Sequence, residues 1–314
     1  MAARQAIEAL VAKAIEAPSS HNSQPWTFEA KAEFIRLYAD RTRALNVNDP
    51  NDRELTISCG CALMNLRAAA AEQGRSLTVK LLPDKDDPDL LAEIKFDGQV
   101  NEDLKPLAKH ISPRRTYRKK FKVDDVPPAI LEDLIDAAAI EGVWFDPLLG
   151  THRAAAAALA SEGDAAQWAN PRWRREVASW MHPRRRGEGL TIPWLALPVA
   201  KLMVRSLDMG KGFGAKDREI AQHSPILAVL GTQKDRVQDW LSAGQGLERV
   251  LLTAAKAGLQ ASYLNQPVQV AHLRAALQSL CTHRGVPQIL LRLGYPMDHV
   301  IAAPRRPLSD VLKM

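Results

Sequence analysis

The chain has 314 residues, of which 46% are hydrophobic and 25% charged, and its formal net charge is +6. This composition is ordinary for a globular protein and excludes a disordered chain, which has few apolar residues and a large charge excess. At roughly 100–200 residues per domain, the length permits one large domain or two.

The elements predicted for the first hundred residues are helices and short strands. Apolar residues at helical spacing predict an amphipathic helix over residues 2–17, ended by Pro18. A long helix follows over about 53–73, and Gly74 closes it. Short alternating runs predict strands at 26–28, 34–38, 76–82 and 91–96.

A second series begins after a junction over residues 97–113. Helices are predicted at 127–140, 150–168 and 236–257, and strands at 142–145, 225–232, 261–264 and 288–293. The run PILAVLGT at 225–232 is continuously apolar, which is typical of a buried central strand. The tail, 304–314, is predicted to be irregular. Helices with a few strands in each half predict an α+β layered fold.

Residues 168–215 have a composition of their own, with tryptophans, many arginines, several prolines and five glycines. Such a segment is typical of a lid or excursion over a pocket. A pair of surface helices joined by loops explains the same composition, and the sequence does not decide between the two.

The charge and the cysteines limit the partners and the compartment. A basic chain can bind nucleic acid or hold an anionic ligand. The basic clusters at 114–120 and 172–186 lack the aromatic-plus-basic signature of nucleic-acid binding, which argues against nucleic acid. Three cysteines, an odd and sparse set, argue against a disulfide scaffold and for a reducing compartment. With no secretory signal and no run of 18 apolar residues, the chain is expected to be cytoplasmic, without a membrane or nucleic-acid partner.

Three stretches carry candidate chemistry. PSSHNSQPW at 18–26 crowds short hydrogen-bonding side chains into one turn, either to end a helix or to hold a polar, planar ligand. RRTYRKKF at 114–121 is either a solvated basic turn or a guanidinium cluster that faces phosphate or carbonyl oxygens. Arg292 lies inside an apolar run and needs a buried partner, either a phosphate or a carboxylate.

Motifs of several other enzyme classes are missing from the sequence. It contains no GxGxxG after a strand, no GxxxxGK[ST] loop, no HExxH and no GxSxG. The eight histidines show no metal-ligand spacing, so no metal site is predicted.

Taken together, these stretches make the chain resemble the nitroreductase superfamily of FMN flavoproteins. It is most similar to the longer single-chain branch, sometimes called Acg-like, in which two nitroreductase-type modules are fused. The matching stretches span nearly the whole chain: PSSHNSQPWTF at 18–28, RELTISCGCALMNLR at 53–67, RRTYRKKF at 114–121, residues 239–270, and PQILLRLGYP at 287–296. The resemblance implies a fused pseudo-dimer with modules at 1–105 and 106–314 and a lid-like insertion at 168–215.

In ordinary members of the superfamily, two subunits build two FMN sites at their interface, one giving an Arg-rich motif and the other the PSSxNxQPW loop. Each motif occurs once here, so the resemblance implies one FMN site between the modules of a monomeric pseudo-dimer or homodimer. The implied FMN-binding residues are Pro18, Ser19, Ser20, Asn22, Gln24, Arg114, Arg115, Thr116 and Arg118. The resemblance also places Gly258 and Leu259 near flavin N5 and Arg292 near the phosphate.

The implied function is that of an FMN-dependent NAD(P)H oxidoreductase. Hydride from NADH or NADPH passes through flavin N5 to a nitroaromatic, quinone or related small-molecule acceptor, in a ping-pong sequence that needs no catalytic side chain. The alternative is an FMN-binding or storage protein whose lid closes off the flavin and leaves little reductase activity.

Overall fold

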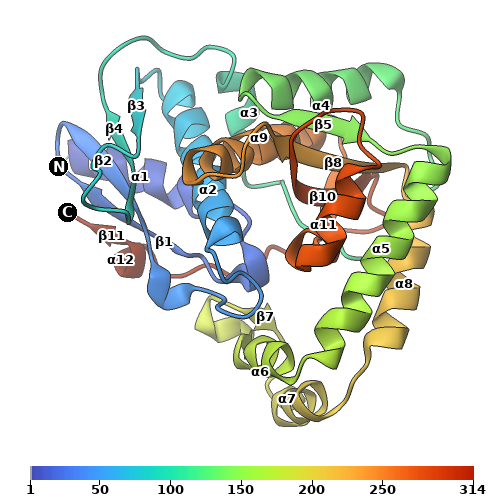
Figure 1. Cartoon of the computed structure of the whole chain (residues 1–314). Helices are drawn as coiled ribbons and strands as arrows, with labels where there is room; N and C mark the ends of the chain where they lie inside the picture. Colours follow the sequence, from blue (N-terminus) through green and yellow to red (C-terminus); the bar gives the residue numbers. More distant parts are fainter. Residues whose placement is uncertain (1) are drawn as a thin grey trace.

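Figure 1 shows the computed structural model of the chain, which describes residues 2–314. Two main β-sheets lie on either side of a pair of long helices, α2 (Arg53–Glu72) and α9 (Val237–Lys256). This mixture of helices and sheets confirms the predicted α+β class. No helix among the described residues is long and apolar enough to cross a lipid bilayer.

The first sheet has five strands in the order β11-β1-β2-β4-β3. Its strands are β1 (Trp26–Ala30), β2 (Phe34–Ala39), β3 (Thr78–Leu81), β4 (Leu90–Lys95) and β11 (Leu312–Lys313). Strands β1 to β4 pair in antiparallel fashion, whereas β11 runs parallel to β1 and places Leu312 beside Phe28. The helices of this half besides α2 are α1 (Ala2–Ala14), α3 (Lys105–Ala108) and α12 (Leu308–Val311).

The second sheet has four antiparallel strands in the order β5-β8-β10-β9. Its strands are β5 (Trp144–Pro147), β8 (Ile226–Thr232), β9 (Gln260–Tyr263) and β10 (Val286–Gly294). Strand β8 is buried along its whole length, as its apolar run predicts. The helices around this sheet besides α9 are α4 (Pro128–Ile140), α5 (Gly150–Ala169), α8 (Gly210–Gln222), α10 (Gln266–Gln269) and α11 (Ala271–Gln278).

The segment 168–215 is largely helical. It contains α6 (Pro171–Ser179), α7 (Leu197–Ser206), the beginning of α8, and a small parallel pair of β6 (Met181–His182) with β7 (Leu190–Thr191). Single 3₁₀ turns complete the chain at η1 (Ser20–Asn22), η2 (Arg41–Arg43) and η3 (Arg184–Arg186). The role of 168–215 as a lid stays a prediction.

Two predicted elements differ from the structure. The helix predicted over 2–17 ends at Ala14, and residues 15–17 continue as turns. The tail 304–314, predicted to be irregular, contains α12 and β11, because its backbone pairs with β1 far away in the sequence. One cluster of buried apolar side chains includes both Phe28 of β1 and Leu230 of β8, while the division into modules at residue 105 stays a prediction.

Helices α2 and α9 approach closely because each has a glycine at the contact. A Cβ atom at Gly60 would lie 2.5 Å from the carbonyl oxygen of Leu241, and one at Gly244 would lie 2.1 Å from that of Ile57. Neither position has room for a side chain. Because 18 of the 20 residues of α2 are buried, this contact fixes the central helix of the fold.

The first prediction concerns this helix contact. Gly244→Ala should lower the free energy of unfolding by at least about 2 kcal/mol, because the added methyl group overpacks a backbone contact. Urea denaturation followed by circular dichroism measures the change. Gly212→Ala is the matched control, since a Cβ at Gly212 in helix α8 meets nothing within 4 Å. That substitution should be neutral or stabilise by up to about 1 kcal/mol, and equal losses in both variants would contradict the close-contact explanation.

Candidate functional site

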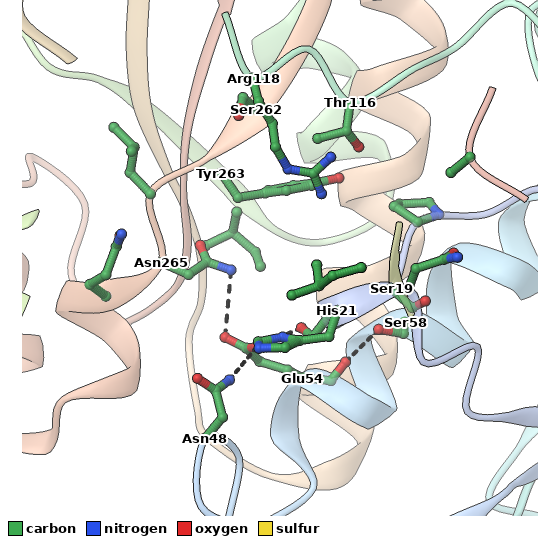
Figure 2. A pocket seen from close by; sticks show the side chains of 18 of the residues that line it. Ser19, His21, Asn48, Glu54, Ser58, Thr116, Arg118, Ser262, Tyr263 and Asn265 are labelled. Atoms are coloured by element: carbon green, nitrogen blue, oxygen red, sulfur yellow. Dashed lines mark hydrogen bonds between the residues drawn. The ribbon is translucent and has the colours of Figure 1, made fainter. Parts of the chain in front are cut away.

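A cavity of about 510 Å³ lies where the two predicted motifs meet. Nine of the predicted site residues line it: Pro18, Ser19, Ser20, Asn22, Arg114, Arg115, Thr116, Arg118 and Arg292. In Figure 2, Thr116 and Arg118 lie on one side, with Tyr263 beside Arg118, and Ser19, His21 and Glu54 lie on the other. The structure therefore brings together stretches that are almost a hundred positions apart.

The loop 18–24 has a strained backbone that faces this cavity. His21, Asn22 and Gln24 have φ angles of 54°, 54° and 53°, in the left-handed region that non-glycine residues rarely adopt. One hydrogen bond within the loop supports this geometry, since the backbone N–H of Gln24 donates to Ser19 Oγ at 3.0 Å. Such strain persists only where several surrounding contacts hold the backbone in that geometry, which is common at ligand sites.

Glu54 anchors this loop from the first turn of α2. Its carboxylate is 2% exposed and accepts hydrogen bonds from Ser20 Oγ at 2.6 Å and from Gln269 Nε2 at 2.9 and 3.0 Å. The N-terminal end of a helix also favours a negative charge. Glu54 is not among the residues predicted from the sequence, and the one available signal was a carboxylate among the apolar residues of the predicted helix.

His21 lies next to Glu54 on the cavity wall (Figure 2). Desolvation lowers the pKa of its imidazole to about 4, while the charge of Glu54 opposes this shift and that of Arg118 adds to it. The ring is therefore neutral at pH 7 and offers one donor and one acceptor.

Arg114 and Arg115 are largely occupied by contacts within the protein. Arg114 is 4% exposed, and its Nε lies 3.2 Å from Oε1 of the fully buried Glu248. Burial raises the pKa of Glu248 to about 7, although the charge of Arg114 opposes this shift. The side chain of Arg115 donates to the carbonyl oxygen of Arg114 at 2.7 Å. Thr116 forms a bridge to Ala261 of β9, so the segment is fixed to a sheet edge.

Arg118 differs from these two arginines. Its guanidinium lines the cavity and forms no hydrogen bond or ion pair with any residue in the described range 2–314. Desolvation lowers its pKa, and the neighbouring Tyr263 acts in the opposite direction. An arginine without a hydrogen-bond or ion-pair partner at a cavity wall is free to bind an anionic or carbonyl-bearing ligand.

Arg292 is fully buried and lines the cavity, and its hydrogen-bond partners within residues 2–314 are backbone carbonyl oxygens, not a carboxylate. It donates to the carbonyl oxygens of Lys119 at 2.9 Å and Tyr117 at 3.1 Å, and its guanidinium carbon lies 4.7 Å from the ring centre of Phe121. Burial lowers its pKa to about 10. It holds the RRTYRKKF segment in place, and a phosphate contact stays a prediction.

Gln24, Gly258 and Leu259 do not line the cavity. Gln24 is fully buried, and its Nε2 donates to the carbonyl oxygen of Gly187 at 2.8 Å while its Oε1 accepts from the backbone N–H of Arg306 at 2.9 Å. Its side chain therefore joins three distant segments. Cofactor contacts by these three residues stay predictions.

The C-terminal tail adds a residue that the sequence analysis missed. Arg305 lines the cavity and donates to the carbonyl oxygens of Ile15 at 2.7 Å and Glu16 at 2.7 Å, and to Asn22 Oδ1 at 3.2 Å. Burial lowers its pKa to about 10. No local pattern around Arg305 indicates these contacts, because its partners lie almost 290 positions away.

No family model matches the chain, but relatives with similar sequences exist. "Putative NAD(P)H nitroreductase acg" of Mycobacterium tuberculosis is 29% identical over 321 residues, covering 99% of this chain and 96% of that protein. "Putative NAD(P)H nitroreductase Rv3131" of the same organism is 29% identical over 319 residues, covering 98% and 91%. These relatives confirm the resemblance to the nitroreductase superfamily and to its acg-like members.

Among solved structures, the FMN-dependent nitroreductase NfnB from Mycobacterium smegmatis in complex with NADPH aligns with 67% of this chain and 99% of that chain. The identity is 15% and the TM-score 0.45.

The second prediction concerns Gln24. Gln24→Ala should lower the free energy of unfolding by about 2–4 kcal/mol, because it leaves the buried carbonyl of Gly187 and the partly buried N–H of Arg306 unpaired. Chemical denaturation measures the loss, and the exposed Gln99 supplies the control variant Gln99→Ala. A stable Gln24→Ala protein that has lost only ligand binding would contradict the structural role.

Proposed function

We propose that the chain is an FMN-dependent NAD(P)H oxidoreductase of the nitroreductase type, with FMN bound in the cavity between loop 18–22 and residues 114–118. The observation that carries the proposal is the convergence of these two stretches on one cavity, with the guanidinium of Arg118 free to meet a ligand. The names of the relatives, NAD(P)H nitroreductases, support the same activity and the same reductant.

The residues present suit such a cofactor. A cavity of about 510 Å³ falls within the roughly 300–1,000 Å³ usual for small-ligand sites. Six cationic side chains line it against four acidic ones, which favours an anionic ligand such as a flavin phosphate: Arg114, Arg115, Arg118, Lys216, Arg292 and Arg305 against Glu16, Glu54, Asp164 and Asp217. Ser19, Asn22 and the neutral His21 add short donors and acceptors for the edge of a planar ring.

Bound FMN would supply hydride-transfer chemistry. Arg118 would stabilise the negative charge that develops on the ring during reduction, because a fixed cation in a poorly solvated wall acts strongly on developing charge. The strained loop 18–24 is already held in place and needs little further ordering when a ligand binds. A shared cavity for reductant and acceptor agrees with a ping-pong sequence in which one leaves before the other enters.

The acceptor is proposed to be a nitroaromatic, a quinone or a related small molecule. The pseudo-dimer arrangement, with FMN between the two modules, and the cytoplasmic location remain part of the proposal. In the alternative, a flavin-storage protein, the segment 168–215 would close over the cofactor, and Trp173, Val177, Leu190 and Phe213 of this segment do line the cavity.

Spectroscopy of the purified protein tests the proposal. A visible flavin spectrum that NADPH or NADH bleaches within seconds under anaerobic conditions is the expected result. A colourless protein that also fails to take up added FMN would overturn the proposal. A flavin that stays oxidised would favour the storage alternative.

The third prediction concerns Arg118. Arg118→Ala should raise the Kd of the apoprotein for FMN by about 10- to 100-fold, because a charge-assisted hydrogen bond contributes roughly 1.5–3 kcal/mol. Quenching of FMN fluorescence measures the Kd. Arg284→Ala removes an exposed arginine that does not line the cavity and should leave the Kd unchanged. Equal affinity in both variants would exclude Arg118 from the cofactor site.

A further inference from the structure

Helices α5 and α8 contribute two carboxyl groups to the cavity wall that the proposed FMN contacts do not use. Asp164 of α5 and Asp217 of α8 share one neutral partner, since Gln266 Nε2 donates to Asp164 Oδ1 at 3.0 Å and to Asp217 Oδ2 at 2.8 Å. Asp164 is 4% exposed and Asp217 is half-buried, and both line the cavity. The buried Oδ2 of Asp164 has no hydrogen-bond partner of its own in residues 2–314.

Two glycines of α8 hold these carboxyls together. A Cβ at Gly210 would lie 2.9 Å from Cβ of Trp168, and one at Gly214 would lie 2.7 Å from Oγ of Ser161, so the helices touch without intervening side chains. Both carboxyls accept a hydrogen bond from the same Gln266 nitrogen, which brings them close together. Two carboxylates at this separation repel each other unless one of them is protonated. A proton on Asp164 would also remove the uncompensated charge from its buried Oδ2, which has no partner among residues 2–314.

A pair of aromatic rings lies one helical turn away from the two carboxyls. Trp168 follows Asp164 by four residues, and Phe213 precedes Asp217 by four, so each pair shares a helix face at a spacing of about 6 Å. The Trp168 and Phe213 rings stack with centroids 5.0 Å apart and an interplanar angle of 18°. Phe213 remains 44% exposed, so part of its ring stays open for a flat ligand.

We propose that the Asp164–Asp217 pair is a proton donor to a flat carbonyl- or nitro-bearing acceptor that lies in the cavity beside Phe213. The proposal rests on the proposed function, which supplies the reducing equivalents as a hydride. For a quinone, hydride transfer to one carbonyl oxygen forms an O–H bond. Both C=O π bonds are lost as the ring becomes aromatic, and the other oxygen carries the negative charge of the hydroquinone monoanion. The negatively charged oxygen then takes the shared proton, forming an O–H bond, and the pair regains a proton from water.

The surroundings agree with this role. Burial, with the charge of Asp217 added, raises the pKa of Asp164 to about 7, and burial also raises the pKa of Asp217. The charged groups that face the pair are Lys216 of α8 and Arg292 of β10, and α10 contributes the neutral Gln266. A general acid works best when its pKa lies near the working pH.

The fourth prediction is tested first through stability, without any cofactor. Carboxyls with raised pKa values bind more protons in the folded chain than in the unfolded one. Their contribution to stability is therefore fully present below the ordinary carboxyl pKa of 3.8 and is lost as the pH rises to about 7. Between pH 5 and pH 8, the Tm of the wild type should fall by a few degrees relative to the Tm of Asp164→Asn. Glu162→Gln, an exposed change on the same helix, is the control and should follow the wild type.

The second readout is the oxidation of the reduced holoprotein by 1,4-benzoquinone in a stopped-flow instrument. Wild-type and Glu162→Gln proteins should slow by about tenfold per pH unit above about pH 7, whereas Asp164→Asn should be at least about tenfold slower at pH 6 and insensitive to pH. FMN occupancy and reduction by NADPH should be unchanged in Asp164→Asn. An identical pH profile in Asp164→Asn, with FMN bound and reducible, overturns the donor role alone. A protein that binds no FMN overturns the proposed function and the donor role with it, while the Tm comparison still decides whether the pair shares a proton.

Discussion

The backbone contact between Gly60 and Gly244 is the constraint on which both walls of the cavity depend. Helix α2 carries Glu54, which anchors loop 18–24 through Ser20, and α9 carries Glu248, which anchors Arg114. The distance between these two anchors is set by how closely the helices cross. A packing contact without polar side chains therefore determines where the polar groups of the site lie, because a close-packed interior transmits small displacements.

Most buried charged side chains of the site have a charged or hydrogen-bonding partner within residues 2–314, and two features at the cavity wall lack an ion-pair partner. Arg114 pairs with Glu248, while Arg305 is surrounded by carbonyl oxygens. Within residues 2–314, the guanidinium of Arg118 has no such partner, and the Asp164–Asp217 pair lacks a salt bridge. Arg118 supplies a positive charge, and the Asp164–Asp217 pair supplies a proton. A reductase needs both, since it must stabilise charge on its cofactor and neutralise charge on its acceptor.

Local patterns in the sequence predicted much of the fold, but only some of the contacts at the site. The apolar run of β8 and the helical periods of α2 and α9 report burial directly, because burial follows from side-chain spacing. The convergence of residues 18–22 with 114–118 followed from the family resemblance. Sequence could not show that Gln24 faces Gly187 and Arg306, or that Asp164 and Asp217 share Gln266. Those contacts depend on which distant segments pack together, and residue types at one position do not encode their partners.

The strain in loop 18–24 explains why the end of the chain belongs to the site. Left-handed backbone at three non-glycine residues costs on the order of 1–3 kcal/mol each, so the loop needs external support. The tail provides it: Asn22 Nδ2 donates to the carbonyl oxygen of Pro304 at 3.1 Å, and Arg306 donates to that of Gln24 at 3.0 Å. Strand β11 then fixes the tail against β1. Because the loop is held in this geometry by residues close to position 314, an isolated segment 1–105 would lack the contacts that keep the loop ready for a ligand.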